Sequence, residues 1–148
     1  MTALSVSTDP AKLDIDFIYQ FLSTEARWCL GIPRAVVEKS LNNSLCFGVY
    51  DDNVQVGFAR VVTDYATFGN LVDVFVIPDR RGQGIARMLL EAVVTHPDLI
   101  GLRRFTLATS DKHELYRKFG FTELGRPEIF MEIFRPDVYK DSRNVFES

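Results

Sequence analysis

The sequence has few of the residues that build metal centres or disulfide frameworks. Its 148 residues include two cysteines, Cys29 and Cys46, and two histidines, His96 and His113. Two cysteines are too few for a disulfide framework or for a zinc site made of cysteines alone, and no Cys–His cluster accompanies them. We therefore predict no metal, and two reduced, buried thiols of the kind found in cytoplasmic proteins.

Long apolar runs are also missing. No stretch approaches the ~20 apolar residues that a membrane-spanning helix needs. The first six residues have neither the basic region nor the apolar core of a signal peptide. The sequence therefore predicts a cytoplasmic protein with no membrane partner.

Basic residues are not in excess. Lysine and arginine number 17 against 20 aspartates and glutamates, which gives a net charge of −3. That balance excludes a protein that coats nucleic acid through a generally basic surface, so no nucleic-acid partner is expected. Hydrophobic residues make up 47% and charged residues 25%, which is ordinary for a globular protein, and a chain of this length can bury one core. We expect a single domain over residues 1–148.

The hydrophobic pattern predicts alternating helices and strands. Strands are expected over 4–7, 45–50, 54–63, 71–77, 104–109 and 129–134, and helices from Asp14 or Asp16 to 30, over 33–41, 84–96 and 111–119. An antiparallel meander followed by a β-α-β crossover predicts an α/β (α+β) fold with a mixed, mostly antiparallel central sheet and helices on both faces. Gly57, inside a strand, predicts a bulge or a close backbone approach.

The segment most informative about chemistry is the loop between the strand 71–77 and the helix 84–96. A strand that runs through a glycine-containing loop into a helix directs free backbone N–H groups and the positive end of the helix dipole at one spot. Gly82 and Gly84 leave room for an anion, and arginines at 80, 81 and 87 add positive charge. The pattern predicts binding of a phosphate or pyrophosphate.

Two common nucleotide motifs do not fit this loop. Arg87 stands where a dinucleotide-binding fingerprint requires its third glycine, and the Walker form G-x-x-x-x-G-K-[ST] is absent. Neither NAD nor ATP is therefore favoured as the ligand.

Two segments together resemble a known family. Residues 81–86 (Arg-Gly-Gln-Gly-Ile-Ala) are similar to the R/Q-x-x-G-x-G/A motif of the GCN5-related N-acetyltransferase (GNAT) family, and residues 115–121 (Leu-Tyr-Arg-Lys-Phe-Gly-Phe) to its LY-x-x-x-GF motif. The gap between them suits a helix, a strand and the start of a helix. The resemblance is strongest over 45–125.

The resemblance implies an enzyme, an acetyl-CoA-dependent acyltransferase. Its acetyl group would pass from acetyl-CoA, a co-substrate, to a primary amine of an unidentified small-molecule or peptide acceptor, by direct attack in a ternary complex. In the family a splay in the sheet, here after the strand 71–77, admits the pantetheine arm, and a strand N–H near Phe75 or Val76 would polarise the thioester carbonyl. The cofactor-binding residues implied are Phe75, Val76, Arg81, Gly82, Gln83, Gly84, Ile85, Ala86, Arg87 and Thr109.

The resemblance places Tyr116 at the position of the general acid. An ordinary tyrosine, with a pKa of ~10, is protonated at neutral pH and can give its proton to the departing thiolate. The general base is open. Asp73, a carboxylate within an otherwise apolar strand, is either the base or a structural acceptor of hydrogen bonds. Asp64 and Tyr65 are further candidates for the base.

This sequence departs from the family pattern near the second motif. Thr109 stands where asparagine is frequent, and Lys112 where a small residue is frequent. Thr109 can still bond a pantetheine amide, and Lys112 can contact a CoA phosphate. Trp28 and Phe68 either line the acceptor site or belong to the core.

Other functions and assemblies remain open at this level. A non-catalytic acyl-CoA sensor or another nucleotide-binding α/β domain would use the same loop. By analogy with the family, whose members often pair through their C-terminal strands, residues 129–148 are a candidate edge for a homodimer.

Overall fold

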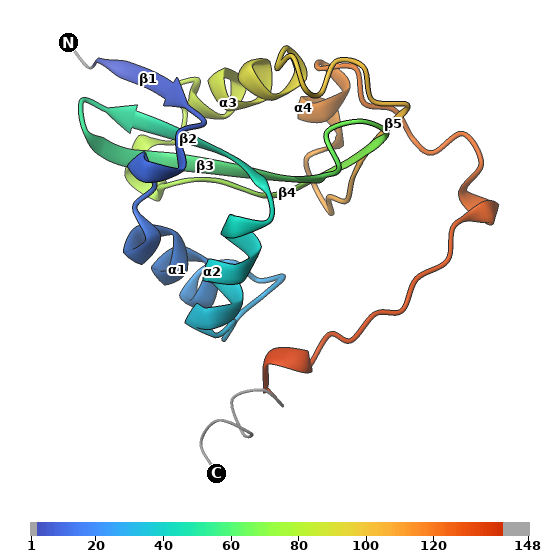
Figure 1. Ribbon diagram of the computed structural model, residues 1–148, viewed down its shortest axis with the longest axis horizontal. Coiled ribbons are helices and arrows are strands. Elements are labelled where there is room, and N and C mark those ends of the chain that lie inside the picture. Colours follow the sequence, from blue (N-terminus) through green and yellow to red (C-terminus); the bar gives the residue numbers. More distant parts are fainter. Residues whose placement is uncertain (1–2, 141–148) are drawn as a thin grey trace.

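The computed structural model describes residues 3–140, which form a five-stranded sheet (Figure 1). The strands lie in the order of the sequence: β1 (Leu4–Ser7), β2 (Leu45–Asp51), β3 (Val54–Thr63), β4 (Phe68–Val76) and β5 (Arg104–Leu107). The first three pairings are antiparallel and the β4–β5 pairing is parallel. The predicted mixed, mostly antiparallel sheet is confirmed. In the described part of the chain no helix is long and apolar enough to cross a membrane.

Helices cover both faces of this sheet, as the sequence predicted. Figure 1 shows α1 (Ile15–Thr24) and α2 (Arg34–Asn42) on one face and α3 (Ile85–Val94) on the other, with the short α4 (His113–Arg117) beside β5. Because successive strand side chains point to opposite faces, neighbours on β4 belong to different cores. Phe75 packs in the cluster under α1 and α2, whereas Val76 packs in the cluster under α3.

Gly57 brings α3 close to the sheet. A Cβ on Gly57 would lie 3.2 Å from Ile85 Cγ2 and 3.3 Å from Phe75 O. The predicted close backbone approach is therefore present, and it lies beneath the first residue of α3. Any side chain at Gly57 would push on the start of that helix.

The parallel pair β4–β5 is short. Residues Phe68–Leu71 of β4 pair with Arg104–Leu107 of β5, and β4 then continues alone on that side to Val76. The strands therefore part after Leu71. In the same stretch Asp73 has a φ of +57°, opposite a register shift between Phe58 and Arg60 on β3.

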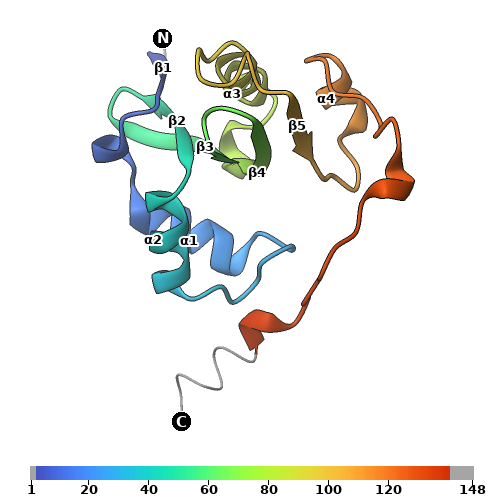
Figure 2. The same cartoon turned by 45° about the vertical axis from the view of Figure 1, so that its right-hand side comes forward.

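The predicted strand 129–134 is wrong. Pro127–Ile129 forms a 3-10 turn and residues 130–135 have no regular structure. We call residues 126–140 the C-terminal arm. Figure 2 shows it leaving the side of α4 and β5 and reaching toward α1 and α2. Periodicity suggested a strand, but in residues 3–140 no neighbouring strand lies beside the arm to pair with it. The rest of the candidate dimer edge, 141–148, lies outside the described residues.

We expect Gly57→Val to destabilise the protein. The new side chain must displace Ile85 or the β4 backbone, and overpacking of this kind costs about 1–3 kcal/mol. Urea unfolding followed by circular dichroism should show a lower midpoint with an unchanged slope.

Gly101→Val is the matched control. Nothing lies within 4 Å of a Cβ built on Gly101, and its φ is not in the left-handed region. Its unfolding free energy should stay within about 0.5 kcal/mol of the wild type. Equal stability of the two variants would contradict the close packing at Gly57.

Candidate functional site

The loop between β4 and α3 leaves amide groups available to a ligand. Gly82 and Gly84 have φ values of +80° and +81°, which L side chains rarely adopt, and nothing lies within 4 Å of a Cβ on either. Gly84 is the residue just before α3, and the first N–H of the helix with a backbone acceptor is that of Met88, which donates to Gly84 O at 3.1 Å. The N–H groups of residues 85–87 thus have no acceptor within the helix. The loop has the open surface, the free donors and the dipole that a pyrophosphate needs.

The three arginines of the loop and of the first turn of α3 have different contacts. Arg80 is partly buried, donates to Asp51 Oδ2 at 2.8 Å and to Gln83 Oε1 at 3.0 Å, and so fixes the loop. Arg81 is exposed and donates through Nε to Val76 O at 3.2 Å. Arg87 is exposed on the first turn of α3. Arg81 and Arg87 are therefore the arginines of this loop whose side chains face solvent.

The open side of β4 carries Val76. Ile77 N donates to Val56 O at 3.0 Å, toward the β3 side. Successive residues of a strand direct their N–H groups to opposite sides, so Phe75 N–H faces β3 and Val76 N–H faces the side that β5 has left. Arg81 reaches Val76 O on that open side. Of the two residues considered for polarising a carbonyl, Val76 is the one whose N–H points away from β3.

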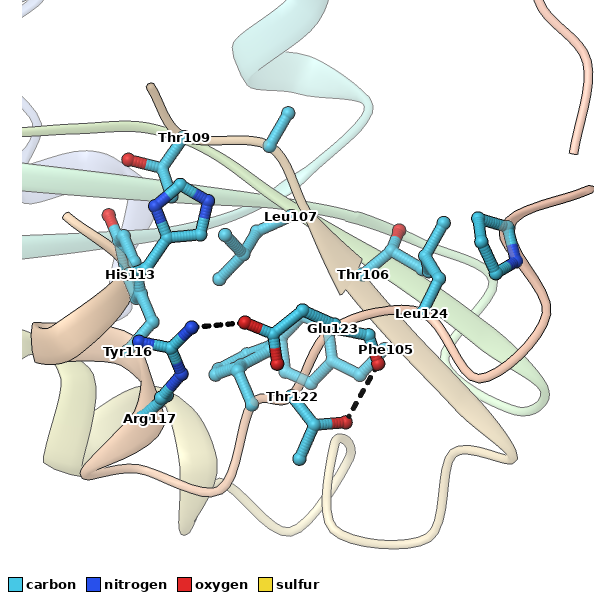
Figure 3. A pocket seen from close by; sticks show the side chains of 13 residues that line it. Phe105, Thr106, Leu107, Thr109, His113, Tyr116, Arg117, Thr122, Glu123 and Leu124 are labelled. Atoms are coloured by element: carbon cyan, nitrogen blue, oxygen red, sulfur yellow. Dashed lines mark hydrogen bonds and ion pairs between the residues drawn. The ribbon is translucent and has the colours of Figure 1, made fainter. Parts of the chain in front are cut away.

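Tyr116 lines a groove beside β5 and α4 (Figure 3). The groove has a volume of about 470 Å³, and its lining includes Leu107, Thr109, His113 and Tyr116. Burial, and to a lesser degree the charge of Asp111, raises the pKa of the Tyr116 phenol above its ordinary value. The phenol therefore keeps its proton throughout the neutral range.

The two departures from the family pattern lie at the start of α4. Thr109 Oγ1 accepts a hydrogen bond from Lys112 N at 3.1 Å, which holds the turn before the helix. The hydroxyl proton of Thr109 stays free to donate. Thr109 is one of the groove residues, whereas Lys112 is exposed and outside the groove's lining.

Asp73 lies on the other side of β4, within a polar network. Its side chain is 7% exposed. Oδ1 accepts from Trp28 Nε1 at 2.8 Å, and Oδ2 pairs with Arg60 Nε at 3.0 Å. Arg60 in turn donates to Ser44 Oγ at 2.9 Å. Both carboxylate oxygens are thus already engaged.

The same network settles the position of Trp28. Its ring is 57% exposed although its N–H is fixed on Asp73, so Trp28 is a surface residue and not part of the core. The partners of Asp73 come from β3 and from the segments around α1 and α2, far apart in the sequence. No local motif around Arg60 or Ser44 signals this contact, and the sequence analysis missed both.

The other two candidates for the general base, Asp64 and Tyr65, lie at the turn between β3 and β4, and the contacts of Asp64 do not suit a base. Asp64 accepts hydrogen bonds from the N–H groups of residues 66, 67 and 68 and from the Thr67 hydroxyl, and these bonds hold its pKa well below the usual range. A carboxylate of such low basicity is a poor proton acceptor. Tyr65 is half exposed on the same turn, and Phe68 is also exposed at the start of β4.

Both cysteines are buried and free. Burial raises the pKa of the Cys29 thiol to about 12 and that of Cys46 to about 11. A thiol with so high a pKa is protonated at neutral pH and is a weak nucleophile. The prediction of two buried, reduced cysteines is confirmed.

Comparison with known proteins gives consistent matches. The model of the acetyltransferase (GNAT) domain matches residues 42–123. A candidate acetyltransferase of Gibberella zeae is 36% identical over 135 residues, which cover 76% of this chain and 75% of that protein.

Solved structures agree with these matches. The crystal structure of a candidate GNAT-family acetyltransferase from Xanthomonas campestris is 50% identical and has a TM-score of 0.91, covering 94% of this chain and 98% of that chain. The crystal structure of a Clostridium acetobutylicum protein, described as a candidate acetyltransferase with acetyl-CoA, shares the fold at 17% identity and a TM-score of 0.63, covering 90% of this chain and 96% of that one.

The family model spans more than half of the chain, and both the open loop at Gly82 and Gly84 and the groove residue Tyr116 lie within the matched region. The chain therefore belongs to the GNAT family of acetyltransferases.

Proposed function

We propose that this chain, as a single domain over residues 1–148, transfers an acetyl group from acetyl-CoA to a primary amine in a ternary complex. One observation carries the proposal: β4 and β5 part directly before the loop that presents Gly82, Gly84 and the free amides of α3. Strand backbone without a β partner, followed by a loop suited to pyrophosphate, suits an elongated thioester with a phosphorylated end. A cytoplasmic location stays a prediction from the sequence.

The residues present fit acetyl-CoA. The left-handed glycines leave the loop surface unobstructed, and residues 85–87 offer free N–H donors beside the exposed guanidinium groups of Arg81 and Arg87. The Thr109 hydroxyl can donate to a pantetheine amide. The Clostridium protein with acetyl-CoA has the same fold, which agrees with this ligand.

The chemistry follows from these positions. The neutral amine nitrogen attacks the thioester carbonyl carbon and forms a C–N bond, while Val76 N–H stabilises the negative charge on the carbonyl oxygen. The tetrahedral intermediate then breaks its C–S bond and expels the CoA thiolate. The protonated Tyr116 phenol donates its proton to that sulfur, and the amine proton passes to solvent or a base. Because both thiols are protonated and buried, neither is placed to accept the acetyl group, and we propose a direct transfer without an acetyl-cysteine.

The role of Asp73 as the base stays a prediction, and its contacts favour the other alternative. Both of its oxygens accept hydrogen bonds from groups that do not react. We propose that Asp73 is a positioning residue that holds the indole of Trp28 at the surface next to β4. Trp28 then forms part of the wall that the acceptor contacts.

The first prediction concerns the ligand. Thermal unfolding should show a rise of several degrees in Tm with acetyl-CoA and CoA, and none with ATP or NADH, because a ligand at 100 times its Kd adds about 2.7 kcal/mol of stability. Gly84→Val should lose this rise, since its side chain is strained at a φ of +81° and points into the ligand face. Gly101→Val should keep it. A shift with ATP or NADH alone would contradict the proposal.

The second prediction concerns Tyr116. Tyr116→Phe should lower kcat by about 10²–10⁴ while the KM for acetyl-CoA stays nearly constant, because the ring remains and only the proton is lost. Tyr19→Phe, on α1, should leave kcat unchanged. Burial raises the Tyr116 pKa, so the wild-type rate should not fall through loss of its proton below about pH 10.

If kcat of Tyr116→Phe equals that of the wild type, the Tyr116 phenol is not the general acid. If the wild type binds acetyl-CoA tightly but turns over no amine in a broad acceptor screen, the chain is a sensor of acyl-CoA and not an enzyme.

The third prediction separates the two roles of Asp73. For a positioning role, Asp73→Asn and Trp28→Phe should both raise the KM for the acceptor, by similar factors of about ten, with kcat and its pH profile retained. A general base would instead show a fall in kcat of about 10²–10⁴ in Asp73→Asn alone and loss of the acidic limb of the profile.

A further inference from the structure

The loop that presents Gly82 and Gly84 has little backbone support of its own. In the described part of the chain the N–H groups of residues 82–84 make no backbone hydrogen bond, and the two glycines flank Gln83 with φ values of +80° and +81°. Glycine loses more conformational freedom on ordering than any other residue, so a fixed shape of this loop is entropically costly. Side chains must therefore hold the loop in the shape that a pyrophosphate needs.

Arg80 is the side chain that connects this loop to the sheet. It is the last residue of the 3-10 turn Pro78–Arg80, which follows β4, and its side chain is 17% exposed. Its Nη1 donates to Asp51 Oδ2 at 2.8 Å, and its Nε donates to Gln83 Oε1 at 3.0 Å. We call Asp51, Arg80 and Gln83 the Arg80 clamp.

Asp51 attaches the clamp to a rigid part of the molecule. It is the last residue of β2, where it pairs with Leu4 of β1 on one side and with Val54 of β3 on the other. Its side chain is 21% exposed, so its ion pair with Arg80 is partly buried and is screened less than a pair on the open surface. Two strand pairings at Asp51 thus fix the position of the Arg80 guanidinium relative to the sheet.

Gln83 receives its orientation from Arg80. The amide of a glutamine has one acceptor oxygen and an NH2 group with two donors, and in Gln83 the oxygen accepts from Arg80. The Nε2 group, at the other corner of the planar amide, is left to donate, and Gln83 is exposed on the loop. An amide that turned freely could present its oxygen to an anion. The bond from Arg80 selects the orientation that suits a phosphate.

The geometry of this contact is specific to arginine. Nε and Nη1 belong to a rigid planar fork and bond two separate groups, which the single ammonium nitrogen of a lysine does not reproduce. The third nitrogen, Nη2, is shielded from solvent and has no partner among residues 3–140. A buried donor without a partner is unfavourable, so a guanidinium retained for stability alone would be fully paired. The arrangement indicates that Arg80 serves the position of the loop.

We propose that Arg80 is a positioning residue for the pyrophosphate of acetyl-CoA and that it acts through Gln83. Asp51 anchors the guanidinium to β2, and the guanidinium holds the Gln83 oxygen. The Gln83 NH2 group then donates to a phosphate oxygen beside the free N–H groups of residues 85–87. The inference rests on the proposed use of acetyl-CoA. It adds two residues, Asp51 and Arg80, that touch no ligand and yet set the affinity for it.

Isothermal titration calorimetry with acetyl-CoA tests the clamp without any acceptor. Arg80→Met and Gln83→Ala should each raise the Kd by about tenfold, the loss expected when one hydrogen bond to a charged group is removed. The double variant should show about the same rise as either single variant, because Arg80 acts through Gln83. Dephospho-CoA, which keeps the pyrophosphate and lacks the 3′-phosphate, should respond in the same way.

Two further variants separate position from charge. Arg80→Lys keeps the positive charge but not the fork, so its Kd should rise nearly as much as that of Arg80→Met. Asp51→Asn weakens the clamp from β2 and should raise the Kd in the same direction, which keeps the test valid if circular dichroism shows that Arg80→Met does not fold. Arg34→Met is the matched control: it removes an exposed ion pair with Asp16 on α2 and should leave the Kd unchanged.

The outcomes that overturn the clamp differ from those that overturn the proposed function. A wild type that does not bind acetyl-CoA contradicts both. If the wild type binds it and Arg80→Met or Arg80→Lys binds equally well, the clamp alone is wrong. Effects of Arg80 and Gln83 that multiply to about a hundredfold in the double variant would show that the two residues act independently. A change with acetyl-CoA but not with dephospho-CoA would move the contact to the 3′-phosphate and contradict the proposed role.

Discussion

The parallel pairing of β4 and β5 ends after four residues on each strand, and the arrangement of the site depends on that early separation. Beyond Leu71 the backbone groups on the side of β4 that faced β5 have no strand partner, and Val76 O accepts a hydrogen bond from Arg81 Nε instead. A ligand with its own amide groups can take their place. The separation also leaves Val76 N–H without a strand partner, directly before the β4–α3 loop. If the pair continued to the end of β4, β5 would occupy that N–H and lie against the start of the loop.

Local chemistry explains why much of this was accessible from the sequence. Gly82 and Gly84 occupy a left-handed backbone conformation. The need for that conformation is visible in the sequence because glycine stands at each of the two positions. The pattern of a buried strand, a glycine loop and an amphipathic helix requires only neighbours in the chain. β1 and β3 begin and end where the sequence pattern predicted, whereas β4 starts at Phe68, earlier than expected, because Gly69 and Asn70, which are small and polar, separate Phe68 from the apolar run that begins at Leu71.

Contacts between distant segments were not accessible in the same way. The network of Asp73, Trp28 and Arg60 joins residues 45 and 13 positions apart, and a positive φ at Asp73 turns its side chain toward that network. A buried carboxylate in an apolar strand looks the same in sequence whether it reacts or accepts hydrogen bonds. The error at 129–134 has a related origin. Alternation of apolar and polar residues fits a strand with one buried face, but it does not show whether a neighbouring strand lies in position to pair with it.

Tyr116, the proposed general acid, belongs to α4. This helix has no fully buried residue, whereas α1, α2 and α3 each have at least two. A general acid must be held in position to within a fraction of an ångström. A helix of five residues with no buried side chain fixes the position of Tyr116 less firmly than a longer, buried helix would. Positional accuracy at Tyr116 therefore depends on the packing of α4 against the main core, where Leu115 and Phe119 lie beside Tyr116 as partly buried members of the same cluster.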